Sequence, residues 1–256
     1  KYDTLIEYAY KMLLRNQAHD SICGCSTEDV HNENLIRYKK IKQVANTIID
    51  ELKFKNHFEE KKIINLSDKP FSGIVEFSTA EKLEGYDKIG YQKGFEKTLL
   101  TDTQRIPVTE DYTGINTYLA EVEDVKPNVV DYIMPVSKPS DLNITEYSLE
   151  NSYLFLKIEN GTIYINGIKM SLVDFADLGD SYNFGPKSND KGNELKILRS
   201  KVVLKTHLRA ALKVDFESVW DVVSATISLD RASTSLSFKF DWVNSQKNHI
   251  LNAVFE

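Results

Sequence analysis

The sequence has few cysteines that could form disulfides and no long apolar run that could cross a membrane. It holds 2 cysteines among 256 residues, and Cys23 and Cys25 are separated by one position, so no disulfide framework is expected and the thiols suit a reducing cytoplasm. No apolar run approaches the roughly 20 residues that a membrane-spanning helix needs. The formal net charge of −6 argues against nucleic acid as a partner, because binding to its phosphate backbone needs clustered cations. No signal peptide is visible, and we predict a soluble, cytoplasmic protein.

What the sequence does contain is typical of a globular protein. Hydrophobic residues make up 41% and charged residues 27% of the chain. Its 256 residues exceed a typical domain of about 100–200 residues, so two or three domains are expected. The changing periodicity predicts an α+β fold with three parts: a helical domain over 1–57, a small β-domain over 58–137, and a β-sandwich domain over 138–256 that is incomplete at its C-terminus.

Two amphipathic helices are predicted in the first part. Apolar residues recur at three- and four-residue spacing up to Leu13, which places His19 and Asp20 at or just past the end of the first helix. Ser26 can cap a second helix, with acidic residues following in its first turn. We therefore predict an antiparallel helical hairpin, or part of a bundle, whose second helix buries a regular seam: Leu35, Tyr38, Ile41, Ala45, Ile48 and Leu52.

After residue 62 the pattern becomes that of antiparallel strands. Short strands with β-branched content fill the middle of the chain, and Asn160-Gly161 is a strong hairpin signal between residues 153–158 and 162–165. Leu236, Phe238, Phe240 and Trp242 alternate as one buried face should. Sheets packed face to face are the expected result, with Trp220 and Trp242 assigned to the core.

A polar run between the two helices holds most of the residues that can bind metal. His19, Cys23, Cys25 and His31 lie within thirteen positions, and imidazole and thiolate both suit zinc. One alternative is a zinc site closed within the loop, although the C-x-C spacing argues against it because it fits no common structural zinc pattern. A second is that His19, with or without Asp20, contributes to a site completed elsewhere. The third is a hydrogen-bonded turn with two buried thiols and a partly buried His31.

Residues 16–26 (NQAHDSICGCS), continued by Asp29-Val30-His31 and Arg37-Tyr38, resemble the helical-domain signature of glycoside hydrolase family 38, the zinc-dependent α-mannosidases. Two later stretches resemble the same family in the same order. Residues 179–184 (GDSYNF) with Pro186 are similar to its substrate-facing loop, and residues 241–251 (DWVNSQKNHIL) are similar to a later pair of strands. The resemblance thus spans most of the chain.

The resemblance implies a role for three residues. His19 would be a zinc ligand, Asp20 would contact the bound mannose or its zinc-held hydroxyls, and Tyr182 would reach the same sugar. One zinc ion is implied as cofactor, its site completed by another domain. The implied partner is a mannose-containing oligosaccharide, and a homo-oligomer is allowed.

The family's catalytic carboxylates have no counterpart here. The resemblance assigns the nucleophile and the acid/base to an N-terminal α/β domain, and the chain opens at Lys1 within a helical pattern, so we expect a fragment of a longer retaining α-mannosidase, inactive alone. Asp177 and Asp180 could mimic a glycosidase carboxylate pair, an interpretation that we reject on the same resemblance.

Two alternatives from other classes remain. One is a non-catalytic carbohydrate-binding β-sandwich module with a helical adaptor, which would bind sugar without metal. The other is a metal-sensing or structural protein that uses His19, Cys23, Cys25 and His31, in which case the thiols should matter for metal binding.

Overall fold

The computed structural model describes the whole chain except residues 1, 56–60, 101–106, 113, 136–137 and 181–182. Its residues form two compact units. Unit 1 comprises Lys1–Glu59, Phe175–Lys191 and Asn248–Ile250, and unit 2 comprises Glu60–Asp174, Gly192–Lys247 and Leu251–Glu256. Helices and antiparallel strands occupy separate stretches of the chain, which confirms the α+β class. The three predicted domain boundaries stay a prediction.

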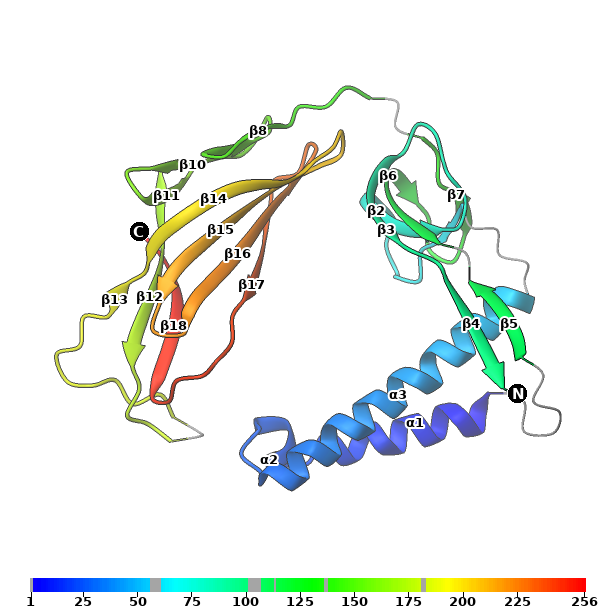
Figure 1. Cartoon of the computed structure of the whole chain (residues 1–256), viewed down its shortest axis with the longest axis horizontal. Helices are drawn as coiled ribbons and strands as arrows, with labels where there is room; N and C mark the ends of the chain where they lie inside the picture. The colour runs from blue at the N-terminus through cyan, green and yellow to red at the C-terminus, as the bar shows by residue number, and fades with distance from the viewer. Residues whose placement is uncertain (1, 56–60, 101–106, 113, 136–137, 181–182) are drawn as a thin grey trace. The chain divides into compact units, whose positions relative to one another are not determined.

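The helices of unit 1 are α1 (Asp3–Asn16), α2 (His19–Cys23) and α3 (Glu28–Lys55). Helix α1 packs along α3 (Figure 1). Buried Asn16 donates from Nδ2 to the carbonyl oxygen of Asn34 at 3.0 Å, and Arg37 donates from Nη1 to Asn34 Oδ1 at 2.9 Å. Near the other end, the Tyr2 hydroxyl donates to Glu51 Oε2 at 2.9 Å. Polar side chains therefore fasten this helix pair at both ends.

The buried face of α3 differs from the predicted seam. Leu35 is 45% and Tyr38 43% exposed, although both were expected to be buried. Ile41 and Ile48 are less exposed, as predicted, but Asn34, Arg37 and Val44 take the places expected for Leu35, Tyr38 and Ala45, one residue earlier in each case. The shift arises because Asn34 and Arg37 hydrogen-bond with α1 and so turn a partly polar stripe toward it. His31, expected to be partly buried, is exposed.

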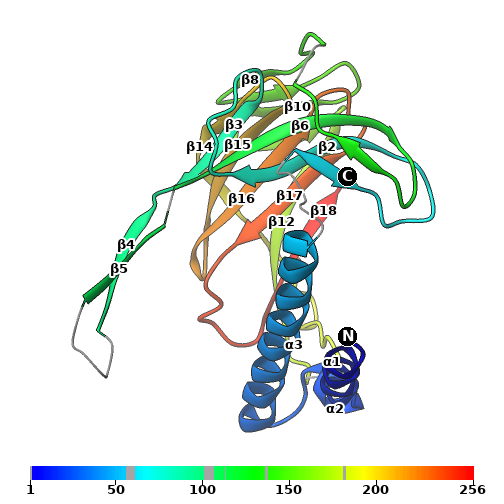
Figure 2. The ribbon, with the colours of Figure 1, turned by 90° about the vertical axis from the view of Figure 1, so that its right-hand side faces the viewer.

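The first part of unit 2 is built from short strands. A three-stranded antiparallel sheet has the order β2 (Phe71–Thr79), β6 (Ile115–Val125) and β3 (Asp87–Gln92). Strands β4 (Phe95–Leu100) and β5 (Pro107–Tyr112) form a two-stranded ribbon of their own (Figure 2), and β1 (Lys62–Ile64) pairs with β7 (Val130–Tyr132). Phe77, Tyr86 and Tyr118 pack together, with ring centroids 5.5 to 6.3 Å apart.

Two larger sheets make up the rest of the β structure. One has the order β13 (Asn193–Glu194), β12 (Ile168–Ala176), β11 (Thr162–Ile165), β10 (Phe155–Glu159), β9 (Ser148–Glu150) and β8 (Asn143–Thr145), and β18 (His249–Phe255) also pairs with β12. The other has the order β14 (Lys196–Lys205), β15 (Arg209–Ser218), β16 (Asp221–Asp230) and β17 (Leu236–Asp241). Both sheets contribute to one hydrophobic core, in which Leu149 and Leu156 pack with Leu212 and Ile227.

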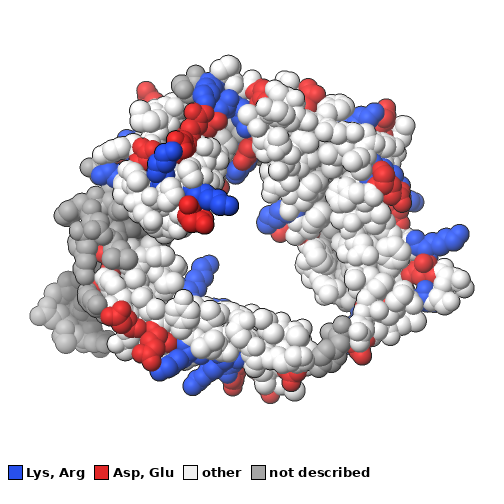
Figure 3. Space-filling model, turned by 180° about the vertical axis from the view of Figure 1, so that it is seen from behind, with Lys and Arg blue, Asp and Glu red and all other residues white. Residues whose placement is uncertain are grey.

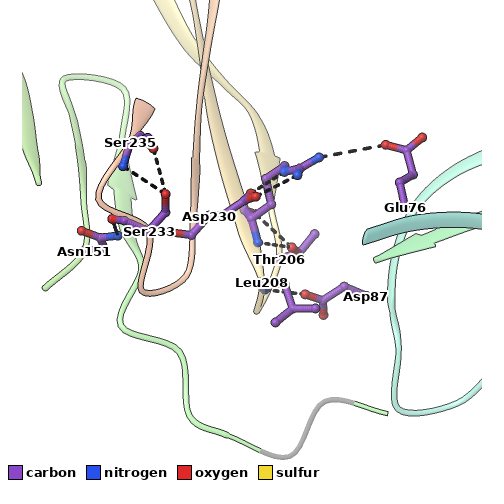
Figure 4. A network of polar contacts seen from close by, with 9 residues as sticks. Glu76, Asp87, Asn151, Thr206, Leu208, Asp230, Ser233 and Ser235 are labelled. Carbon is purple, nitrogen blue, oxygen red and sulfur yellow. Dashed lines mark hydrogen bonds and ion pairs between the residues drawn. The ribbon is translucent and has the colours of Figure 1, made fainter. Parts of the chain in front are cut away.

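Polar contacts connect the β14–β15 turn with the three-stranded sheet (Figure 4). Arg209 donates from Nη2 to Asp230 Oδ2 at 2.9 Å, and its Nη1 lies 4.0 Å from Glu76 Oε2 on β2. The backbone N–H of Leu208 donates to Asp87 Oδ2 on β3 at 2.6 Å. Unit 2 is thus joined by hydrogen bonds as well as by its core.

Candidate functional site

The candidate site begins at α2, a five-residue helix within the connection that was predicted as a turn. His19 and Asp20 are its first two residues, preceded by Ala18 in an extended conformation. Helix α2 ends at Gly24, which has φ +74° and donates its N–H back to the last turn. Since side chains with a Cβ rarely adopt this left-handed conformation, glycine fixes where the helix stops.

His19 and Asp20 form an adjacent pair that faces solvent. Asp20 Oδ1 lies 3.0 Å from His19 Nδ1, and the two side chains are 77% and 68% exposed. When Nδ1 carries the proton and donates it to the carboxylate, Nε2 presents its lone pair, which is the arrangement of most metal-binding histidines. The described residues offer Nε2 no hydrogen-bond partner. The residues therefore fit the zinc implied by the resemblance, as one imidazole ligand with a carboxylate that orients it.

The other metal-capable residues of this stretch do not complete a site. Cys23 is exposed, Cys25 is half-buried, both are free thiols, and His31 lies on α3. Across the described ranges, no three residues of the types His, Cys, Asp and Glu are grouped so that they could hold a metal ion. The interpretation of a zinc site closed within the loop thus finds no support in the geometry.

The loop after β12 is held by Asp177. Its Oδ1 accepts the N–H groups of Gly179 and Gly185, each at 2.9 Å, and the two ends of the loop are further joined by Leu178 N–H to the Gly185 carbonyl oxygen at 2.8 Å. A Cβ on Gly179 would lie 1.8 Å from the carbonyl oxygen of Asn183, so only glycine fits there. Tyr182, the predicted sugar contact, lies outside the described residues.

The carboxylates of this loop have structural tasks. Asp177 closes the loop through two backbone donors, and Asp180 Oδ1 accepts the N–H of Asn183 at 2.9 Å. Carboxylates that satisfy backbone groups are committed to the folded loop. Asp177 and Asp180 are therefore explained by the structure of the loop itself.

The two tryptophans have different surroundings. Trp220 is 5% exposed and lies in the core, whereas Trp242 is 44% exposed just after β17. The prediction of core packing is therefore confirmed for Trp220 and wrong for Trp242. The available signal was the polar run from Asn244 onward, which ends the alternation of β17.

The fold is shared with two solved structures. An α-mannosidase from Enterococcus faecalis matches 97% of this chain with a TM-score of 0.70 at 17% identity, and a glycosyl hydrolase family 38 protein from the same species matches 98% with a TM-score of 0.71 at 17% identity. The chain covers 38% and 40% of those two structures. The resemblance to family 38 is confirmed, and at this identity what it shows is the fold.

Sequence comparison gives a shorter match. A protein of Halalkalibacterium halodurans named "Putative mannosylglycerate hydrolase" is 49% identical over 45 residues, which is 18% of this chain and 5% of that protein. No family model matches the chain.

Proposed function

We propose that this chain is the helical and β-sheet portion of a retaining, zinc-dependent α-mannosidase of glycoside hydrolase family 38. The observation that carries the proposal is the solvent-facing His19–Asp20 pair, in a fold shared over nearly its whole length with two family 38 structures. The non-catalytic module is less favoured, because both of these structures are glycoside hydrolases.

In this proposal His19 holds zinc through Nε2, and Asp20 fixes its ring and tautomer through Nδ1. When bound, zinc supplies a template and a positive charge for vicinal sugar hydroxyls. Asp20 uses one oxygen toward His19, so its second oxygen is left to accept a hydrogen bond from a sugar hydroxyl. Tyr182 is proposed to contact the same sugar.

Retaining hydrolysis needs two carboxyl groups about 5–5.5 Å apart, one as nucleophile and one as acid/base. We assign neither to this chain, and we propose that another part of the same enzyme supplies them. That the chain covers only 38% and 40% of the two structures supports this assignment.

The proposed substrate is a terminal α-linked mannose on a neutral glycan or manno-oligosaccharide. On the face drawn in Figure 3, acidic and basic side chains are interspersed. A second candidate is mannosylglycerate, favoured by the similarity to the Halalkalibacterium protein. The two free thiols, Cys23 and Cys25, support a cytoplasmic location.

The proposal is tested on the whole enzyme with His19→Ala. This variant should lose its bound zinc, measured by elemental analysis after dialysis, together with hydrolysis of aryl α-mannosides. Cys23→Ser, at the other end of α2, is the matched control and should keep both its zinc and its activity. Retention of zinc and activity by His19→Ala, or their loss in Cys23→Ser, would overturn the assignment.

A companion measurement uses the 256-residue chain itself. Because the described residues supply one imidazole rather than three ligands, calorimetric titration with zinc should show no tight stoichiometric binding. Turnover of mannobiose against mannosylglycerate by the whole enzyme then separates the two candidate substrates.

A further inference from the structure

A hollow of about 570 Å³ lies at the end of β17, within unit 2. Its lining combines apolar and polar residues, among them Trp242, Val243, Asp241, Asn244 and Ser224. None of these residues has a part in the proposed zinc site.

Trp242 gives the hollow an aromatic wall. Its side chain is 44% exposed, whereas Trp220, the other tryptophan, is 5% exposed in the core. Tryptophan has a large apolar ring with a single polar N–H, and leaving it exposed forgoes much of the burial that it can provide. An accessible ring beside a few convergent polar groups is the usual make-up of a small-ligand site.

The polar residues that line the hollow can bond with hydroxyl groups. Asp241 Oδ2 lies 3.1 Å from Lys239 Nζ, and its carboxylate can accept hydrogen bonds from ligand donors. Ser224 Oγ donates its hydrogen to Asp215 Oδ1 at 2.6 Å, so toward other groups it is an acceptor. The Asn244 amide both donates and accepts. A ligand with a flat apolar face and several hydroxyls satisfies this set.

Ser224 is held firmly in place. Asp215, which is 3% exposed, accepts hydrogen bonds from Ser224 Oγ and from Arg199 Nε, each at 2.6 Å. The Asp215–Arg199 ion pair therefore fixes the position of the serine oxygen. The described residues that line the hollow include one carboxylate, Asp241, and no Lys or Arg, which disfavours phosphate or carboxylate ligands. These features together select a neutral, polyhydroxylated ring.

We propose that this hollow is a carbohydrate-binding subsite that takes one pyranose ring of a neutral oligosaccharide. The apolar face of the sugar stacks on the Trp242 indole, and its hydroxyls bond with Asp241 and Asn244. The subsite uses no residue of α2 and needs no metal, so it is independent of the proposed catalytic role.

The test titrates the 256-residue chain with mannotriose, maltotriose and cellotriose in the presence of EDTA. Binding is followed by calorimetry and by protection of tryptophan fluorescence from acrylamide. We expect saturable binding of at least one of these sugars, weakened about tenfold or more in Trp242→Ala, which corresponds to about 1.4 kcal/mol. His19→Ala should bind as the unaltered chain does.

Three control variants test whether binding depends on the hollow. Tyr153→Ala removes another exposed aromatic residue, 59% exposed and outside the hollow, and should leave affinity unchanged. Trp242→Phe keeps a ring and should restore part of the affinity. Asp241→Asn keeps the shape but loses the charge, and should weaken binding even if Trp242→Ala fails to fold.

Two results would overturn the proposal. One is the absence of saturable binding of all three sugars up to their solubility limits. The other is saturable binding that Trp242→Ala and Asp241→Asn leave unchanged, or that His19→Ala abolishes. Failure of the zinc proposal alone would leave the EDTA titration unchanged, so the two proposals are tested separately.

Discussion

Replacing Asp215 by asparagine tests whether a buried carboxylate stabilises unit 2. Asp215 lies on β15, with 4% of its side chain exposed, and accepts hydrogen bonds at 2.6 Å from Ser224 Oγ and from Arg199 Nε. Lys213 Nζ lies 3.6 Å from Oδ1. The carboxylate is therefore compensated by two cations and a hydroxyl. Each of these partners comes from β15 or a neighbouring strand.

The magnitude follows from what the amide can replace. Asparagine keeps an acceptor for Ser224 but replaces a buried hydrogen bond to a charged group by a neutral one. Because hydrogen bonds to charged groups contribute about 1.5–3 kcal/mol against about 1 for neutral ones, we expect a loss of about 1–2 kcal/mol. Asp215→Ala also leaves the buried Ser224 hydroxyl without its acceptor and should cost about 2–4 kcal/mol. Arg199 adds little to this loss, since its side chain is 71% exposed and water can solvate it.

The effect should depend on pH. Burial alone would raise the pKa of Asp215, but hydrogen bonds from Ser224 and Arg199 outweigh burial and hold the pKa below its ordinary value of 3.8. A carboxyl whose pKa is lowered on folding stabilises the protein above its unfolded pKa, and this contribution is lost as pH falls through the folded pKa. The difference in free energy of unfolding between the unaltered chain and Asp215→Asn should thus be largest at neutral pH and should decrease below about pH 4.

Urea unfolding at several pH values, followed by the fluorescence of the buried Trp220, measures the free energy of unfolding of unit 2. Asp241→Asn is the matched control: Asp241 lies opposite Ser224 on the next strand, but its side chain is 55% exposed and paired with exposed Lys239. This control should change stability by less than about 0.5 kcal/mol. Equal stability of Asp215→Asn and the unaltered chain at neutral pH, or a difference that does not shrink in acid, would refute the reasoning.

Two further substitutions test the core and the helix that carries His19. Leu212→Ala should cost about 2–5 kcal/mol in urea unfolding, because Leu212 is fully buried between the two sheets, whereas Leu198→Ala, at a position 52% exposed, should cost far less. Gly24→Ala should destabilise the end of α2 by about 1 kcal/mol, owing to its φ of +74° rather than any clash, and Gly24→Asn should cost less. Changes in the amide chemical shifts of α2 in NMR spectra would report the destabilisation by Gly24→Ala. Identical spectra for Gly24→Ala and the unaltered chain would contradict the prediction.

The β structure was predictable where turn chemistry and alternation agree. Asn160 and Gly161, at φ 51° and 75°, join β10 to β11, with Glu159 opposite Thr162, as the hairpin signal predicted. Leu236 and Phe238 pack against the core on alternate positions of β17. Trp242 continues the same alternation in sequence but lies one residue beyond the last residue of the strand, and periodicity does not reveal where a strand ends.

The helical part was harder to predict for two physical reasons. Helix α2 has five residues, too few to show any hydrophobic period, so only the structure reveals that His19 begins a helix. The contact of α3 with α1 runs through Asn16, which donates to the backbone carbonyl oxygen of Asn34 and accepts from Arg37, while apolar Leu35 and Tyr38 are exposed. A seam read from hydrophobicity alone misses such a polar contact.

The His19–Asp20 pair itself argues that this chain contributes one ligand to the proposed zinc site. A catalytic zinc takes three protein ligands and leaves one position open. Asp20 is hydrogen-bonded to His19 Nδ1, whereas Nε2 is the nitrogen that would bind metal. Asp20 therefore orients His19 instead of adding a second ligand. One exposed imidazole binds zinc weakly, and the affinity of the proposed site must therefore come mainly from residues brought to it by another part of the enzyme.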